Sequence, residues 1–246
     1  MPPSDWGWLI TPAELESWIL SQNDDFLVIN KPPHTVCHPS RHGPWSSLIG
    51  ACREYLGLGT LHMPFRLDRE TSGVLVFALH REAGTRLQHA VQAQKVRKEY
   101  LAIAEGHLPG PVTVDAPIGR DEAAAFFSRQ CVRPDGQSAV TSFEPISHSA
   151  SHTLVKARPQ TGRRHQIRVH LSHLGHPIVG DKLYGPDPLL MMEFMEHGFT
   201  EHLASRLPMK RCALHCEEVE FQTERGSELF SAPVAEDMRK FWLRHS

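Results

Sequence analysis

An aspartate flanked by two arginines is the first feature of the sequence that could carry chemistry. Asp68 stands between Arg66 and Arg69, and Thr71-Ser72-Gly73 leads from it into the apolar run Val74–Leu79. The flanking charges favour the ionised carboxylate, and such a group at the mouth of a strand can act as a nucleophile or a base. The alternative is an aspartate that only caps a turn or pairs with Arg69, because structural ion pairs also perturb carboxylates.

A second cluster places several cations at a turn. Arg163, Arg164, His165 and Gln166 follow a Thr-Gly pair, and Arg168 comes two residues later. The helix macrodipole disfavours cations at a helix N-terminus, so this placement indicates a nearby anion, either a phosphate or the Asp68 carboxylate. Arg168 flanks the apolar stripe of the expected helix, which would let its stem pack while its guanidinium faces a cleft. The alternative is a surface arginine without a partner.

A tyrosine on an expected strand could contact a base. Tyr100 shares a strand face with Ala102 and Ala104, whose small side chains leave room above its ring. An aromatic ring with open space above it can stack on a nucleobase. The alternative is an ordinary core tyrosine.

Cysteines and a histidine near the C-terminus raise the question of a metal. Cys212, His215 and Cys216 lie within five residues of one another, but no second ligand pair completes a zinc site. The five cysteines are scattered and odd in number, which predicts a reducing, cytoplasmic setting without disulfides. We therefore expect no metal.

The charge is uneven along the chain. The net charge of -2 argues against broad affinity for nucleic acid. However, Arg81–Lys98 and Lys156–His170 are both rich in Lys and Arg, which suits a phosphate-bearing ligand. The alternative is a pair of solvated helix faces.

Hydrophobic periodicity predicts the elements that must position these residues. Thr11 and Glu14 predict a capped helix over Pro12–Leu20. Further helices are expected at Ser46–Leu56, at Glu82–Val96, around Ile167, Leu171 and Leu174, and within Leu189–Leu207. Strands are expected at Phe26–Asn30, Val74–Leu79, Tyr100–Ala104, Thr153–Ala157 and Val219–Phe221. Strands adjacent in sequence favour an α+β fold with a mixed, mainly antiparallel sheet.

The sequence gives no sign of a membrane segment. No apolar run approaches the length of a transmembrane helix. The N-terminal Met1–Ile10 lacks the basic start and apolar stretch of a secretory signal. We expect a protein without a membrane partner.

Five ordered motifs resemble the RluA-type pseudouridine synthases. They span the chain from about residue 24 to residue 221. The motifs are Asn30-Lys31-Pro32-Pro33 with His38-Pro39, Arg66–Gly73, Lys98-Glu99-Tyr100, Thr161–Leu171 with Gly175–Gly185, and Leu214-His215.

The resemblance implies a fold, a reaction and roles for the residues. It implies a sheet in two halves with flanking helices and a central cleft, an N-terminal helical extension at residues 1–23 and a catalytic domain at 24–246. Asp68 would be the nucleophile that isomerises uridine in rRNA or tRNA, Tyr100 would lie against the base, and Arg168 would pair with Asp68. RNA or substrate contacts would come from Arg66, Thr71, Arg163, Arg164, His165 and Gln166. No cofactor and no partner besides RNA are implied, and we expect a monomer.

Two departures from the family affect the RNA contacts. Phe65 stands where many members have histidine. Because the first motif begins near residue 24, we expect no N-terminal S4 RNA-binding domain, which many members carry. The stretches around Lys95-Arg97-Lys98 and Arg163-Arg164 would then supply more of the binding.

Two rival functions remain open. One is an inert RNA-binding protein, which would have no need of Asp68 beside the RNA. The other is a carboxylate-based hydrolase, which would need Glu70 as a second carboxylate.

Overall fold

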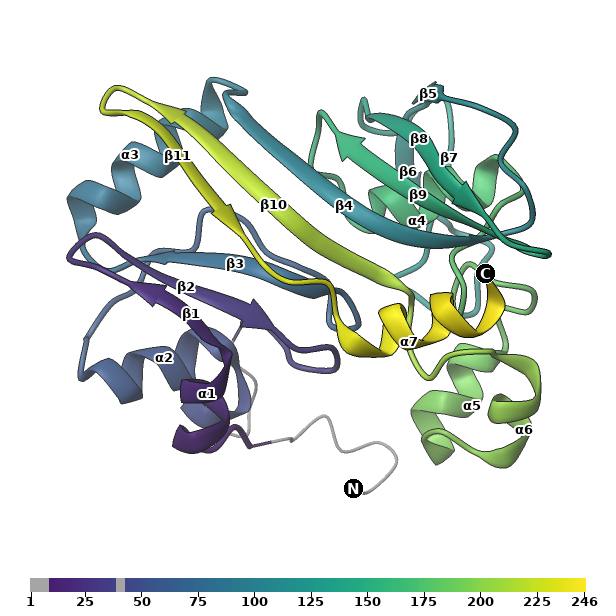
Figure 1. Ribbon diagram of the computed structural model, residues 1–246, viewed down its shortest axis with the longest axis horizontal. Helices are drawn as coiled ribbons and strands as arrows, with labels where there is room; N and C mark the ends of the chain where they lie inside the picture. Colours follow the sequence, from purple (N-terminus) through teal and green to yellow (C-terminus); the bar gives the residue numbers. More distant parts are fainter. Residues whose placement is uncertain (1–8, 39–42) are drawn as a thin grey trace. The chain divides into compact units, whose positions relative to one another are not determined.

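The computed structural model describes residues 9–38 and 43–246. Residues 1–8 of the expected N-terminal extension, and Pro39 of the first motif, lie outside the described residues. The chain forms two compact units (Figure 1). Among the described residues, the first contains 9–38, 43–98 and His215–Ala235, and the second contains Glu99–Leu214 and Glu236–Ser246.

The sheet of the first unit has the strand order β1-β2-β3-β10, with β11 paired to β10. The β3–β10 pairing is parallel and the others are antiparallel. All seven residues of β3 are buried, as expected for an apolar run covered on both faces. The strands are β1 (Ile19–Gln22), β2 (Phe26–Lys31), β3 (Ser72–Ala78), β10 (Leu214–Thr223) and β11 (Gly226–Ser231).

The helices of the first unit begin largely where the sequence predicted. The helix α1 has the expected capping box between Thr11 and Glu14. The helix α3 stops four residues earlier than expected, because Gln94 has a positive φ of 56° and Val96 already begins the strand β4. The helices are α1 (Pro12–Trp18), the short 3-10 helix η1 (Pro44–Ser46), α2 (Leu48–Leu56) and α3 (Arg81–Gln92).

The sheet of the second unit has the strand order β4-β9-β8-β5, and all of its pairings are antiparallel. A separate hairpin pairs β6 with β7. The strands are β4 (Val96–Glu105), β5 (Val112–Asp115), β6 (Ile118–Arg120), β7 (Gln130–Val132), β8 (Val140–His148) and β9 (His152–Pro159). The mixed, mainly antiparallel α+β fold in two halves is therefore confirmed.

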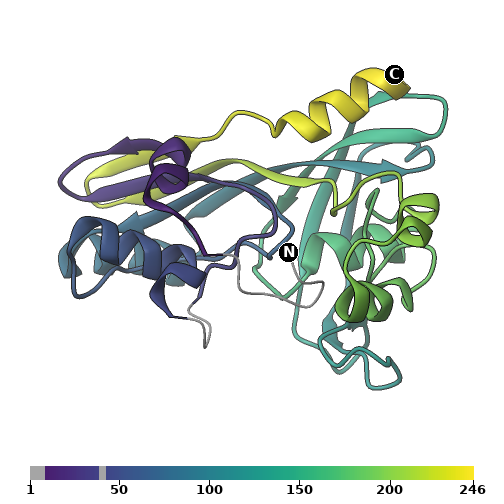
Figure 2. The same cartoon turned by 90° about the horizontal axis from the view of Figure 1, so that it is seen from below.

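The helices of the second unit follow its sheet. The helices α5 and α6 lie side by side in both views (Figures 1 and 2) and share a core of Leu190, Leu203 and Leu207. They resolve the expected excursion at Leu189–Leu207 into two helices. The helices are α4 (Gln166–His173), α5 (Leu190–His197), α6 (Glu201–Arg206) and the unpredicted C-terminal α7 (Glu236–His245). In the described part of the chain, no helix is long and apolar enough to cross a membrane.

Candidate active site

The loop that carries Asp68 is held by a buried lysine. Lys31 is 0% exposed, and its Nζ donates to the carbonyl oxygens of Pro32, Arg69 and Thr71 at 2.9, 3.0 and 2.8 Å. Bonds to three carbonyl oxygens offset the cost of burying the ammonium. This arrangement fixes the backbone on the C-terminal side of Asp68.

Further contacts fix the rest of this loop. The buried Cys37 thiol lies 3.3 Å from the carbonyl oxygen of Leu67, and the Thr71 N–H donates to the carbonyl of Asp68 at 3.1 Å. His34 and Arg69 exchange two bonds, from the His34 N–H at 2.8 Å and from the Arg69 Nε at 3.2 Å. Thr71 itself is buried, so its part in the described structure is to close the loop.

The strand that follows the loop makes a close approach to β10. Gly73 has φ +114°, and a Cβ there would lie 2.1 Å from the carbonyl oxygen of Cys216, so only glycine fits. One residue earlier, the Ser72 hydroxyl is hydrogen-bonded to His215 Nδ1 at 2.9 Å. His215 Nε2 lies 3.4 Å from the carbonyl of Ala232, so both of its ring nitrogens have protein partners. His215 thus has a structural role at this crossing.

The residues just before Asp68 face different surroundings. Arg66 is exposed, whereas Phe65 packs against Phe221 with ring centroids 6.2 Å apart. The Nζ of Lys98 lies 5.7 Å from the centroid of the Phe65 ring, and burial lowers the pKa of this ammonium. Phenylalanine at position 65 therefore completes an apolar contact with Phe221 and supports Lys98.

In the second unit, Arg168 is buried and paired with a carboxylate that the sequence analysis did not assign. Its Nε and Nη2 donate to Asp181 Oδ2 and Oδ1 at 2.7 and 2.9 Å, the bidentate geometry of a strong ion pair. Its guanidinium lies 5.0 Å from the centroid of the Tyr184 ring. The pair with Asp181 therefore sets the orientation of the guanidinium plane.

Asp181 is fully buried and remains ionised. Burial alone would raise the pKa of Asp181. The charge of Arg168, the hydrogen bonds that Arg168 donates, and those from the Tyr184 and Leu183 N–H groups together lower this pKa to about 2. Both N–H groups lie 3.0 Å from Oδ1, and the Cys212 thiol lies 3.6 Å from Oδ2. Asp181 belongs to the motif segment Gly175–Gly185. In the sequence, the feature that could have identified it is its position as an acid in a largely apolar segment.

The turn before α4 is tied together by Gln166. Its Oε1 accepts from the Thr161 hydroxyl and the Arg163 N–H at 2.7 and 2.9 Å. Its Nε2 donates to the Val140 carbonyl and the Thr141 hydroxyl, both at 2.9 Å. An amide has two donors and two acceptor positions, and here the protein uses all four. Gln166 therefore shapes this turn in the described structure.

His165 and Tyr100 complete the second unit's candidates. His165 has a positive φ of 57°, and its Nδ1 is hydrogen-bonded to the Tyr184 hydroxyl at 2.7 Å. Tyr100 lies on β4 opposite Ala157 of β9, with 7% of its surface exposed. The second unit thus contains Tyr100, Arg168 and the turn residues, while Arg66, Asp68 and Thr71 belong to the first.

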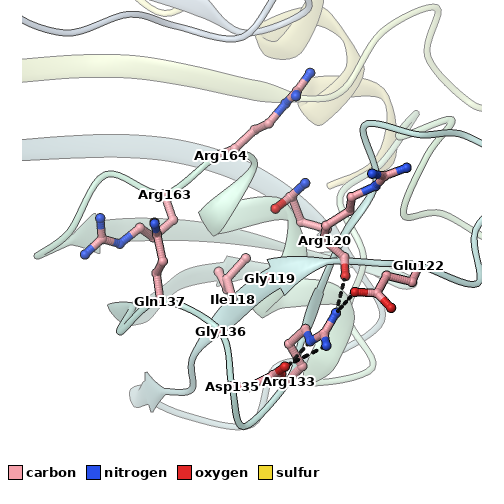
Figure 3. Close-up of a pocket in the computed structure, with 11 residues that line it drawn as sticks. Ile118, Gly119, Arg120, Glu122, Arg133, Asp135, Gly136, Gln137, Arg163 and Arg164 are labelled. Atoms are coloured by element: carbon pink, nitrogen blue, oxygen red, sulfur yellow. Dashed lines mark hydrogen bonds and ion pairs between the residues drawn. The ribbon is translucent and has the colours of Figure 1, made fainter.

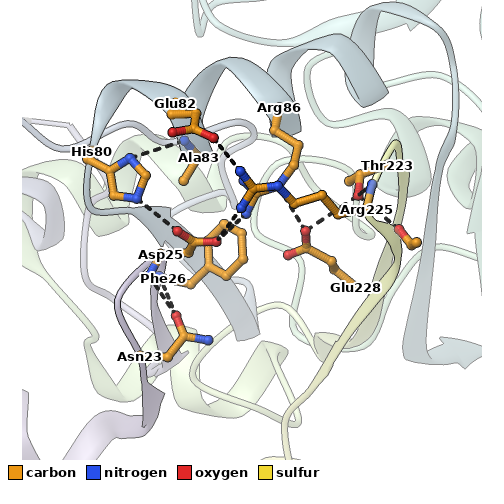
Figure 4. Close-up of polar contacts among 11 residues, drawn as sticks. Asn23, Asp25, Phe26, His80, Glu82, Ala83, Arg86, Thr223, Arg225 and Glu228 are labelled. Atoms are coloured by element: carbon orange, nitrogen blue, oxygen red, sulfur yellow. Dashed lines mark hydrogen bonds and ion pairs between the residues drawn. The ribbon is translucent and has the colours of Figure 1, made fainter.

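Remote acids neutralise much of the basic stretch Arg81–Lys98. Arg86, whose side chain is 2% exposed, pairs with Asp25 at 2.5 Å and with Glu228 at 3.0 Å (Figure 4). Hydrogen bonds from His80 and Arg86 lower the pKa of Asp25 despite its partial desolvation. Arg86 is therefore a structural cation that ties α3 to the sheet.

Other cations of the two basic stretches are paired in the same way. Arg97 donates to Glu218 and Glu220 at 2.6 and 3.0 Å. In the second unit, Glu99 bridges Lys156 and Arg158 at 2.5 and 2.7 Å. By contrast, no ion pair joins Arg163 or Arg164 to a carboxylate among residues 9–38 and 43–246. Within the stretch Lys156–His170, the positive charge without a carboxylate partner is therefore concentrated at that turn.

No group of three His, Cys, Asp or Glu side chains in the described ranges could hold a metal ion. The cysteines at 37, 52, 131, 212 and 216 are all free thiols. The side chains described above offer carboxylate and guanidinium chemistry, which needs no metal ligand set.

Comparisons with known proteins show the family to which the chain belongs. A family model described as RNA pseudouridylate synthase matches residues 25–173. The chain is 38% identical over 239 residues to the ribosomal large subunit pseudouridine synthase D of Xanthomonas campestris pv. campestris, covering 93% of this chain and 69% of that protein. It is 37% identical over 227 residues to the protein of the same name from Vibrio vulnificus, covering 89% of this chain and 68% of that protein.

Solved structures show the same relationship. Human RNA Pseudouridylate Synthase Domain Containing 4 superposes with a TM-score of 0.73 at 25% identity, covering 95% of this chain and 94% of that one. Human RNA Pseudouridylate Synthase Domain Containing 1 gives a TM-score of 0.69 at 26% identity, covering 95% and 86%. The chain therefore belongs to the RNA pseudouridylate synthase family and is an RNA pseudouridine synthase, an isomerase.

Proposed function

We propose that this enzyme converts uridine to pseudouridine in large-subunit ribosomal RNA with Asp68 as its nucleophile. The choice of RNA follows the name shared by the relatives from Xanthomonas campestris pv. campestris and Vibrio vulnificus. The choice of Asp68 as nucleophile rests on the structure of its loop. Hydrogen bonds from the buried Lys31 and from Cys37 hold the backbone of this loop in place. A reactive carboxylate that is held rigidly in place reaches the transition state at a lower cost in entropy.

In the proposed reaction the Asp68 carboxylate adds to the sugar C1′ or to the base C6. The bond from C1′ to N1 breaks, the uracil turns, and a new bond forms from C1′ to C5. The bond to Asp68 breaks to release the carboxylate, C5 loses its proton, and N1 gains one. Tyr100 lies against the base and helps to remove the C5 proton, while Arg66 holds the nucleotide after it has left the RNA stack.

Arg168 supplies the positive charge that keeps Asp68 ionised and oriented as the nucleophile forms. Support for this role comes from its bidentate pair with Asp181, which sets the plane of the guanidinium. We assign Asp181 as a positioning residue that acts through Arg168. Arg163 and Arg164 contact RNA phosphates, because neither has a carboxylate partner in the described part of the chain.

The decisive experiment maps pseudouridine in large-subunit RNA from cells that carry the wild type, Asp68→Asn or Glu70→Gln. We expect Asp68→Asn to abolish product while RNA binding persists, because an amide cannot form the covalent adduct. Residual turnover above about a hundredth of wild type would exclude Asp68 as the nucleophile, since losing a covalent catalyst costs several powers of ten.

Glu70→Gln separates this proposal from a hydrolase with two carboxylates. The isomerase should keep most of its activity in this variant, whereas a paired-carboxylate hydrolase should lose it. The expectations of a monomer and of a cytoplasmic setting stay predictions, and size-exclusion chromatography with light scattering tests the first.

A further inference from the structure

A basic pocket lies in the second unit between the β6–β7 hairpin and the turn that precedes α4 (Figure 3). It encloses about 420 Å³, which is within the range of ligand sites. Its charged lining residues are Arg120, Glu122, Arg133, Asp135, Arg163 and Arg164. Four arginines against two carboxylates leave two positive charges in excess.

The two carboxylates of this pocket are both engaged by one arginine. Arg133 donates through Nε and Nη2 to Asp135 at 2.5 and 2.7 Å, and through Nη1 to Glu122 at 3.0 Å. Arg120 and the turn arginines have no ion-pair partner within the described ranges. Figure 3 shows Arg133 turned toward the acids and the other three turned away from them. The excess charge therefore resides on Arg120, Arg163 and Arg164.

The frame of the pocket is rigid. The Gln137 N–H donates to the Ile118 carbonyl at 2.8 Å, and the Ile118 N–H donates back at 2.9 Å. A Cβ on Gly136 would lie 2.5 Å from the Ile118 carbonyl carbon, so the turn rests directly against β6. Ile118 is itself buried in a core cluster with Val169 of α4. Charges on such a frame need little reorganisation when an anion binds.

One tyrosine connects the pocket to Arg168. The Tyr184 hydroxyl accepts the N–H of Gln130 on β7 at 2.9 Å and is bonded to His165, next to Arg164, at 2.7 Å. The Arg168 guanidinium lies over the ring of the same tyrosine. A ligand in the pocket would thus be held at a fixed position relative to Arg168.

We propose that this pocket binds the sugar-phosphate backbone of the RNA substrate, at a phosphate outside the target nucleotide. The inference rests on the proposed function and adds Arg120, which the sequence analysis did not identify. Arginine is well suited to phosphate, and contacts to phosphate position RNA without reading its sequence. Because Arg163 and Arg164 point in different directions in Figure 3, a chain of phosphates fits these charges better than one free ion.

The test measures binding of the full chain to poly(C) RNA at several salt concentrations. This probe has the phosphates of the substrate but no uridine, so it reports the backbone contact alone. Arg120→Gln with Arg164→Gln should lower the slope of log Kd against log salt by about 1.4, at about 0.7 for each lost phosphate contact with a single strand. The control is Arg239→Gln, which removes an exposed arginine of α7 outside the pocket.

Activity on unmodified large-subunit RNA gives a second readout. The double variant should raise KM and leave kcat near wild type, because the contact is the same in the ground and transition states. A salt slope equal to that of Arg239→Gln would overturn the proposal. A second result would also overturn it: inorganic phosphate that binds the wild type without competing with poly(C). The pocket would then bind a free anion and not the RNA backbone. Since poly(C) contains no uridine, a smaller slope supports the pocket even if no pseudouridine were formed.

Discussion

Replacing Asp181 by asparagine removes the carboxylate that pairs with Arg168 and almost nothing else. The amide oxygen can still accept the N–H groups of Leu183 and Tyr184, which lie 3.0 Å away. The amide nitrogen, however, would then take the place of Oδ2 and face the Arg168 Nε at 2.7 Å, so a donor would oppose a donor. Arg168, with 8% of its surface exposed, would lose its buried counter-charge.

The structure sets the size of the expected effect on stability. The pKa of Asp181 falls from 3.8 to about 2 on folding, and a shift of this size corresponds to about 2.5 kcal/mol. Breaking a buried ion pair by removing one partner typically costs about 3–5 kcal/mol. We therefore expect Asp181→Asn to lower the free energy of unfolding by about 2–4 kcal/mol in urea titrations at pH 7.

The effect on catalysis separates a positioning role from a purely structural one. Displacement of a catalytic group by about 1 Å can cost about a hundredfold, so kcat should fall by about that factor while KM changes little. Under the proposed pairing of Arg168 with Asp68, the acid limb of the kcat–pH profile should move to higher pH, because a misplaced cation would favour the ionised carboxylate less. The matched control is Asp115→Asn, the same chemical change at an exposed position of the same unit. A folded Asp181→Asn enzyme with wild-type kcat and pH profile would refute the positioning role.

Three further outcomes follow from the same contacts. Because the folded pKa of Asp181 is depressed, its contribution to stability is present above pH 3.8 and is lost as the pH falls toward 2. The difference in unfolding free energy between wild type and Asp181→Asn should therefore shrink as the pH falls through that window. A difference that stays constant would contradict this prediction. Arg168→Lys should recover only part of the activity lost in Arg168→Ala, since an ammonium cannot reproduce the bidentate contact with Asp181; equal kcat values for Lys and wild type would exclude a role for the planar fork. Chelator-treated, reduced protein should stay folded and active, because His215 is bonded through both ring nitrogens to Ser72 and Ala232; stoichiometric zinc in elemental analysis would show otherwise.

The charged network of the first unit could not be predicted from the sequence. The stretch Arg81–Lys98 contains several cations and a single acid, so it resembled a phosphate-binding surface. In the structure Arg86 pairs with Asp25 and Glu228, which lie about 60 and 140 residues away in the chain. Hydrophobic periodicity identifies which faces of an element are buried, but it does not identify which remote acid reaches a buried cation.

The sequence by itself determined the family, the α+β class, most helices and strands, and the candidates Asp68, Tyr100 and Arg168. Each depends on local order along the chain: a motif, a capping box at Thr11 and Glu14, or an apolar period. Only the tertiary structure decided that Asp181 pairs with Arg168, that Lys31 fixes the loop of Asp68, and that Arg120 joins the turn arginines in one pocket. Such contacts depend on long-range strand pairing and on the burial of charge, and neither leaves a local pattern. The three-residue strands β6 and β7 are also too short to show a period of two, so the hairpin that carries Arg120 had no sequence signal.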